Sequence, residues 1–143
     1  MKKRIDKALE LFSTGYNCSQ AVIGAYAKDL GLDENTAMKM AGAFGGGMRC
    51  GEVCGGVTGA LMALGLKYGQ ESGDDQDAKA NCNNLTIRFM DEYVKRNKSY
   101  LCKELLGFDV RDEEKREQNK ETMQEVCPNA IVLAIEILEE IGM

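Results

Sequence analysis

The stretch from Val53 to Leu66, VCGGVTGALMALGL, contains no charged residue. A helix that is apolar on every side is buried in the middle of a protein, so this segment predicts the central helix of the fold. Gly55, Gly59 and Ala63 recur within it at four-residue intervals and leave a smooth strip that a neighbouring backbone could approach. Because each glycine inside a helix costs roughly 0.5 to 1 kcal/mol relative to alanine, the pattern indicates a packing or cofactor constraint.

Apolar residues recur at helical spacing on the N-terminal side of this segment. They predict three helices, over residues 5–14, 18–30 and 34–44. Asn17 and Gln20 have the spacing of a capping box, in which each side chain bonds the backbone of the other residue, so the second helix should begin directly after Asn17.

On the C-terminal side, the spacing of Cys82–Tyr93 predicts a long helix. The charged stretch Gly107–Glu125 is typical of a solvated helix or a mobile arm. Pro128 suits the first position of a last helix, which would make Cys127 its N-cap. No segment alternates between apolar and polar residues as a strand would, so we expect an all-α fold. The chain as a whole, residues 1–143, should form a single-domain bundle of about six helices around the buried glycine-rich helix.

The composition excludes several classes of protein. The chain has no histidine, which removes Ser-His and Cys-His nucleophile pairs, imidazole metal ligands and haem attachment through Cys-x-x-Cys-His. A net charge of -5 and the lack of a basic stripe argue against a nucleic-acid partner. No apolar run approaches the roughly 20 residues that span a bilayer. Asp6 and Glu10 interrupt any signal-peptide segment, so we expect a cytoplasmic protein without membrane insertion.

The cysteines are the most informative residues. Cytoplasmic thiols are kept reduced, so six cysteines point to metal binding or redox chemistry more than to structural disulfides. Four of them fall in or beside the predicted first turn of a helix, where backbone N–H groups and the helix dipole stabilise a thiolate and lower its pKa. A thiolate is both a nucleophile and a metal ligand. In a small bundle these four could converge on one pocket: Cys18, Cys54, Cys102 and Cys127.

The two other cysteines and the glycine-rich loop before the central helix have other interpretations. Free cysteine is often a small core hydrophobe, and we assign Cys82 to the core. Cys50, separated from Cys54 by three residues, is an additional candidate metal ligand. The glycine-rich loop Gly45–Glu52 lacks the Lys-Ser/Thr ending of a P-loop, so we expect no bound nucleotide. Arg49 in this loop would either compensate for thiolates or form a surface salt bridge.

Four segments together resemble the C_GCAxxG_C_C family, whose members are described as redox-active. The resemblance covers nearly the whole chain and implies that one cysteine from each segment belongs to the functional set. Val53 and Gly56 depart from the family pattern, which has glycine and alanine at these positions; both changes leave the thiols in place. The matching segments are Asn17–Val22 (NCSQAV), Cys54–Leu61 (CGGVTGAL), Cys102–Gly107 (CKELLG) and Cys127.

The resemblance also suggests a cofactor. The family is similar to the cysteine-bearing part of split-Soret cytochromes, where an iron-sulfur centre accompanies haem. This implies an iron-sulfur cluster here, whereas haem attachment does not carry over because the chain has no histidine.

Three functional hypotheses follow. In the first, four thiolates hold an iron-sulfur cluster, most simply with two irons, for electron transfer. In the second, the protein is a thiol/disulfide oxidoreductase or redox sensor. In the third, the cysteines bind zinc or another thiophilic metal without catalysis, or simply support a structural bundle. The first two require a redox partner. The charge-poor glycine strip and eight methionines would also suit a homodimer.

Overall fold

The computed structural model describes all 143 residues. The predicted all-α fold class is confirmed: the chain forms helical segments and no strand, apart from an isolated antiparallel β-bridge between Val53 and Leu101. There are eight α-helices and one irregular turn, η1, rather than about six helices. Their bounds are α1 (Lys2–Ser13), α2 (Cys18–Tyr26), α3 (Glu34–Ala41), η1 (Gly47–Gly51), α4 (Gly55–Tyr68), α5 (Gln76–Asn97), α6 (Cys102–Leu106), α7 (Glu113–Gln118) and α8 (Lys120–Ile141).

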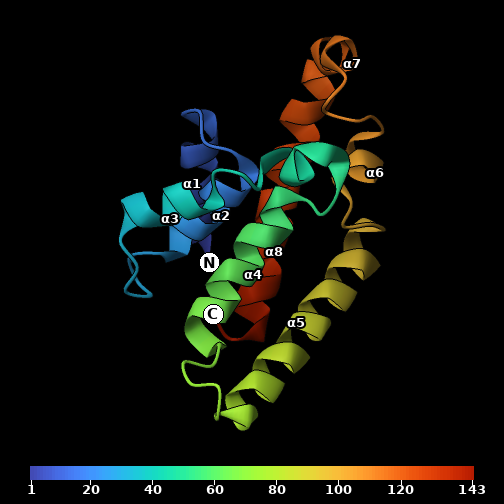
Figure 1. Cartoon of the computed structure of the whole chain (residues 1–143). Helices are drawn as coiled ribbons and strands as arrows, with labels where there is room; N and C mark the ends of the chain where they lie inside the picture. Colours follow the sequence, from blue (N-terminus) through green and yellow to red (C-terminus); the bar gives the residue numbers. More distant parts are fainter.

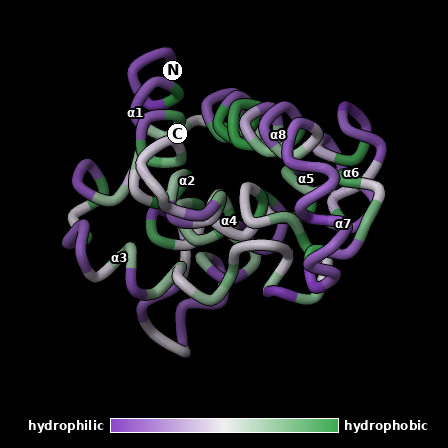
Figure 2. Tube along the Cα trace, turned by 90° about the horizontal axis from the view of Figure 1, so that it is seen from above, coloured by the Kyte–Doolittle hydropathy of each residue, from purple (hydrophilic) through white to green (hydrophobic).

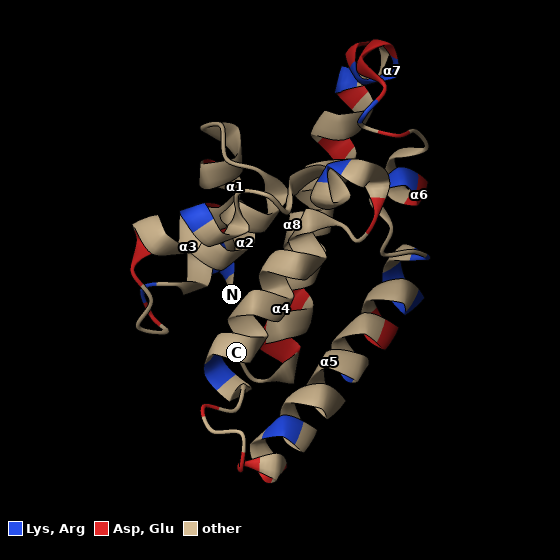
Figure 3. Ribbon diagram, viewed as in Figure 1, with Lys and Arg blue, Asp and Glu red and all other residues tan.

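Two long helices form the middle of the molecule. Figure 1 shows α4 and α8 side by side, with α5 along one flank and α1, α2 and α3 along the other. α7 projects beyond one end of this arrangement. In Figure 2 hydrophilic residues dominate α7, whereas hydrophobic residues recur along α8. Figure 3 shows that α4 carries charge only at its C-terminal end, where Lys67 lies.

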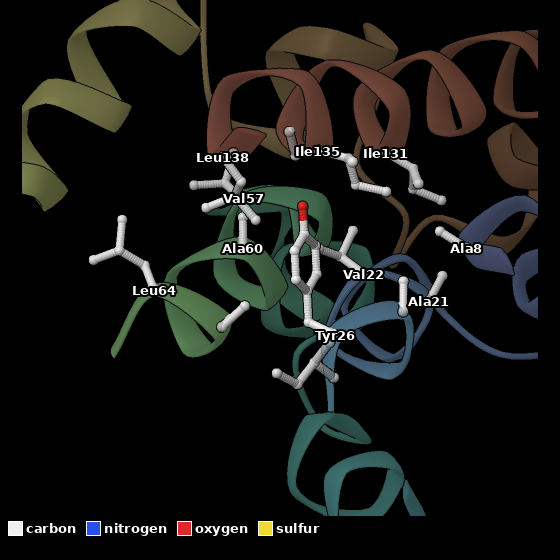
Figure 4. Close-up of a cluster of buried hydrophobic side chains, with 14 of the residues drawn as sticks. Ala8, Ala21, Val22, Tyr26, Val57, Ala60, Leu64, Ile131, Ile135 and Leu138 are labelled. Atoms are coloured by element: carbon white, nitrogen blue, oxygen red, sulfur yellow. The ribbon is translucent and has the colours of Figure 1, made fainter. Parts of the chain in front are cut away.

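The core lies where α2, α4 and α8 meet. α2 is the most enclosed helix, with seven of its nine residues buried. Tyr26 reaches from α2 toward α8 in Figure 4, and its ring is fully buried beneath the Arg4 guanidinium, 4.2 Å from the ring centroid. α4 is buried along one broad face, but its Leu66 side chain is 41% exposed. The central position predicted for α4 is therefore shared with α2.

The glycine strip of α4 makes close backbone contacts. A Cβ atom added at Gly59 would lie 2.6 Å from the Ser19 carbonyl oxygen in α2, and one at Gly55 would lie 3.0 Å from the Cys18 Cβ. A Cβ at Gly56 would lie 3.2 Å from the Ala130 carbonyl oxygen in α8. Since α2 covers the strip, the strip is not a free surface for a second copy of the chain. The expected homodimer stays a prediction.

The start of the last helix differs from the prediction. α8 begins at Lys120, so Pro128 lies inside the helix and Cys127 is not an N-cap. Proline has no N–H to donate to the Gln124 carbonyl, and this lost bond normally breaks a helix. The helix continues because its first turns pack on a second small hydrophobic cluster, built by Cys102, Leu106, Phe108 and Val110 with Met123, Val126 and Cys127.

No helix of the structure has the length and apolar character needed to cross a membrane.

The packing of α4 leads to a matched pair of glycine substitutions. Gly59→Ala should destabilise the protein by about 1 to 3 kcal/mol, because the new methyl group meets α2 backbone. Gly65→Ala, in the same helix, should instead stabilise it by up to about 1 kcal/mol, since a Cβ there meets nothing within 4 Å. Urea unfolding of both variants measures the difference. Equal changes in the free energy of unfolding for the two variants would contradict the close approach of α2 and α4.

Candidate functional site

Four cysteines from four helical elements line one cavity. Cys18 is the first residue of α2, Cys54 is the N-cap of α4, Cys102 is the first residue of α6, and Cys127 lies within α8. All four are free thiols. The cavity has a volume of about 160 Å³, and 11 of its 15 lining residues are hydrophobic. We call it the cysteine cavity.

A capping box holds Cys18 in place. The Asn17 side chain accepts a hydrogen bond from the Gln20 backbone N–H (2.8 Å), and the Asn17 N–H donates to Gln20 Oε1 (2.9 Å). The capping box predicted from these two residues is therefore confirmed. Gln20 also donates through Nε2 to the Met38 carbonyl, which ties this end of α2 to α3. The first residue of α2, and with it the Cys18 thiol, is positioned by both contacts.

The β-bridge brings Cys54 and Cys102 together although they are far apart in sequence. The Cys54 N–H donates to the Tyr100 carbonyl, and the Cys102 N–H donates to the Glu52 carbonyl, each at 2.7 Å. These two bonds flank the bridge between Val53 and Leu101. The loop before α4 is thereby joined to the start of α6, and both cysteines are buried, with 6% and 8% of their surfaces exposed.

Cys18 and Cys127 are neighbouring thiols, each of which shifts the pKa of the other. Hydrogen bonding to Cys18 lowers the pKa of Cys127. The same bond, together with burial, raises the pKa of Cys18. The two directions make Cys127 the more acidic thiol of the two.

Burial has the largest effect on the pKa of the two remaining thiols, Cys54 and Cys102. It raises the pKa of Cys54, although the Gly56 and Val57 N–H groups at the start of α4 act in the opposite direction. It raises the pKa of Cys102 to about 12, with the charges of Cys54 and Cys127 adding to the effect. The expectation that each helix start lowers a thiol pKa is wrong for Cys18, Cys54 and Cys102. Desolvation is the largest effect at Cys54 and Cys102, whereas at Cys18 the neighbouring Cys127 has the largest effect and burial adds to it.

The other two cysteines lie outside the cysteine cavity. Cys50, in η1, donates its S–H to the Gly47 carbonyl at 3.4 Å and is not among the lining residues, so the structure does not place it with the four. Cys82 lies in α5 and packs against the main core, in agreement with the prediction. The four cysteines that the sequence analysis grouped together therefore lie at one cavity, and the other two lie outside it. The functional role of the four stays a prediction.

Tyr93 is a member of the site that the sequence pattern assigned only to the core. Its phenol group is buried and accepts a hydrogen bond from Asn97 Nδ2 at 3.2 Å, and it acts to lower the pKa of the neighbouring Cys54 thiol. A buried tyrosine hydroxyl needs a polar partner, and this requirement is the signal that could have pointed to it. Helical spacing alone placed it on a hydrophobic face.

A second hollow, the outer groove, adjoins the cysteine cavity. It has a volume of about 340 Å³. Cys127 is the one cavity cysteine that also lines it, so this thiol faces both hollows. The charged stretch Gly107–Glu125, which the sequence analysis interprets as a solvated helix or mobile arm, contributes to this groove. Its sequence alone gave no indication of this contact. The groove is lined by Phe12, Arg116, Glu117, Lys120, Met123, Gln124 and Cys127.

The four cysteines line one cavity but do not form a preformed metal site. No group of three or more cysteine or carboxylate side chains is placed to hold one metal ion. Four thiolates at about 2.3 Å from one zinc ion must come within about 3.8 Å of one another. Four cysteine thiolates are also the usual ligand set of a cluster with two irons. The number and type of donors fit such a cluster.

These features define a helical protein with a buried four-cysteine site. A family model described as "Putative redox-active protein (C_GCAxxG_C_C)" matches residues 16–141, so the chain belongs to this family of redox-active proteins. The match includes all four cavity cysteines. No curated protein and no solved structure matches the chain significantly.

The thiol pair leads to a prediction about reactivity. In the reduced, metal-free protein, Cys127 should be the first cavity cysteine alkylated by iodoacetamide, because it faces the outer groove and its pKa is lowered. Its rate should rise with pH below the ordinary thiol value of 9.0. Cys18→Ala removes the hydrogen bond and should shift this rise to higher pH. Mass mapping of pulse-labelled peptides gives the order, and earlier labelling of Cys54 or Cys102 would contradict it.

Proposed function

We propose that Cys18, Cys54, Cys102 and Cys127 hold an iron-sulfur cluster, most simply one with two irons, and that the protein transfers single electrons. The observation that carries the proposal is the cysteine cavity itself, where four thiols from distant parts of the chain surround one apolar space. Four thiolates are the usual ligand set of such a cluster. Membership of a redox-active family supports the same conclusion.

The residues of the cavity have defined roles in this proposal. Burial of Cys54 and Cys102 excludes water from two of the ligands. The N–H groups of Gly56 and Val57 at the start of α4 act to lower the pKa of Cys54 and so favour its charged form. A bound cluster supplies one-electron transfer at a potential that such hydrogen bonds and burial adjust.

The pKa directions explain why these thiols need a cationic partner. Burial and the charges of neighbouring cysteines raise the pKa of Cys18, Cys54 and Cys102. Four thiolates without a cation would therefore repel one another in a desolvated space. Metal loading replaces the thiol protons, so occupancy should fall as pH is lowered. The third hypothesis, a single bound zinc ion, has no observation in its favour beyond the four thiols themselves.

Metal analysis tests the cluster. Protein purified without oxygen should contain iron and acid-labile sulfide and show visible charge-transfer absorption. Cys54→Ser should abolish both, because it removes a ligand inside the cavity. Cys82→Ser, the same substitution outside the cavity, should leave iron and sulfide within about 10% of the wild-type content. Equal losses in the two variants, or a wild-type protein free of iron, would refute the proposal.

The mutual effect of Cys18 and Cys127 on their pKa values favours a second function, thiol/disulfide exchange, because thiols that shift each other's pKa in this way are close neighbours. The Cys127 thiolate would attack one sulfur of an exogenous disulfide and release one thiol. The Cys18 sulfur would then attack Cys127 and release the second thiol. The products are a Cys18–Cys127 disulfide and two reduced thiols, so two electrons pass to the substrate. Both functions suit a cytoplasmic protein, because thiols there are kept reduced.

Oxidation of the metal-free protein tests this second function. A small excess of a linear disulfide, oxidised glutathione, should join Cys18 to Cys127, and Cys18→Ser should instead accumulate a mixed disulfide with glutathione at Cys127. Peptide mapping identifies the bridge. In the Cys54→Ser variant the same bridge should still form. A disulfide between another pair of cysteines would rule out the proposed exchange pair.

A further inference from the structure

The loop before α4 contains a left-handed turn that packs on the site. Gly46, Gly47, Met48 and Arg49 follow one another with φ angles of 64°, 61°, 59° and 58°. Met48 and Arg49 are not glycines, so this conformation is sterically unfavourable for both. Gly47 allows the turn to pack closely, because a Cβ there would lie 2.6 Å from the Glu52 nitrogen and 2.8 Å from the Cys102 Cβ.

The turn directs Arg49 to the cysteine cavity. The side chain folds back over Gly46, with Nη1 only 3.3 Å from the position that a Cβ at Gly46 would occupy. Arg49 is one of the 15 residues that line the cavity and the only charged one among them. A backbone without the left-handed turn would project this side chain in another direction.

The charge of Arg49 is not neutralised by a carboxylate. The neighbouring cations are paired: Lys103 with Glu52 at 3.5 Å, and Arg111 with Asp109 at 2.6 Å. Arg49 takes part in no ion pair of the structure. Of the two fates open to this residue, a surface salt bridge is therefore excluded. The cavity has one net positive charge at its boundary.

We infer that Arg49 is the charge-compensating residue of the cysteine cavity: its guanidinium, held by the left-handed turn, stabilises negative charge on the cavity sulfurs and on any group they bind. This role of Arg49 rests on the proposed function only in that the cysteine cavity is taken as the redox site. Arg49 is exposed and solvated, so its effect must weaken as salt is added. When the bound group gains an electron, a nearby cation favours the reduced form and raises the midpoint potential.

Alkylation of the metal-free, reduced protein tests the charge without any cofactor. Cys50 and Cys82 are replaced by serine, and the rates with anionic iodoacetate and neutral iodoacetamide are compared. The ratio of the iodoacetate rate to the iodoacetamide rate reports the electrostatic potential at the thiols, because both reagents attack the same thiolates and only iodoacetate is charged. Arg49→Gln should lower the ratio roughly two- to fivefold at low salt, and Arg49→Lys should preserve it. Lys79→Gln, which removes an exposed charge from α5, serves as the control. An unchanged ratio in Arg49→Gln, or an equal fall in Lys79→Gln, would overturn the inference.

A second measurement uses the protein purified anaerobically with its cofactor. The midpoint potential should fall in Arg49→Gln and remain near the wild-type value in Arg49→Lys, with a difference that narrows as salt is raised. Arg49→Asn is a second neutral variant, because asparagine adopts the left-handed conformation more readily and should fold at least as well. If the wild-type protein contains its cluster and neither Arg49→Gln nor Arg49→Asn changes the midpoint potential, the inference about Arg49 is overturned and the proposed cluster is not. A wild-type protein without iron would overturn the proposed cluster, and the alkylation ratio would then decide the role of Arg49.

Discussion

The close backbone approach of α4 to α2 is the constraint on which the rest of the structure depends. Gly55 and Gly59 leave no room for a side chain between the two helices, so Cys18 at the start of α2 lies beside the N-terminus of α4. Cys54 caps that terminus. The two backbone hydrogen bonds around the bridge between Val53 and Leu101 then bring Cys102 to the same place. The cysteine cavity is thus a consequence of backbone contacts.

The same enclosure determines the electrostatics of the site. Desolvation raises the pKa of the buried thiols more than the backbone N–H groups at the helix starts lower it. A negative charge in this space therefore depends on a cation, whether a bound metal or Arg49. Cys127, which faces the outer groove and whose pKa is lowered by Cys18, is the exception. The site thus combines two buried thiols, Cys54 and Cys102, with two half-buried ones, of which Cys127 faces the outer groove.

Local signals predicted part of the molecule well. The capping box of Asn17 and Gln20 involves residues close in sequence, and their hydrogen bonds form as the spacing indicated. The start of α8 was mispredicted because Pro128 is a strong local signal for a helix start. A distant cluster around Phe108 and Val110 holds the earlier turns of α8, and that contact has no local signature.

The amino-acid sequence by itself determined that the chain is helical, that α4 must pack closely through its glycines, and which four cysteines to compare. These properties follow from helical periodicity and from the size of side chains, both of which act locally. Only the tertiary structure decided that the four thiols line one cavity, that Cys127 pairs with Cys18, and that Arg49 has no carboxylate partner. The physical reason is that charge, burial and sulfur contacts depend on neighbours brought together from distant parts of the chain.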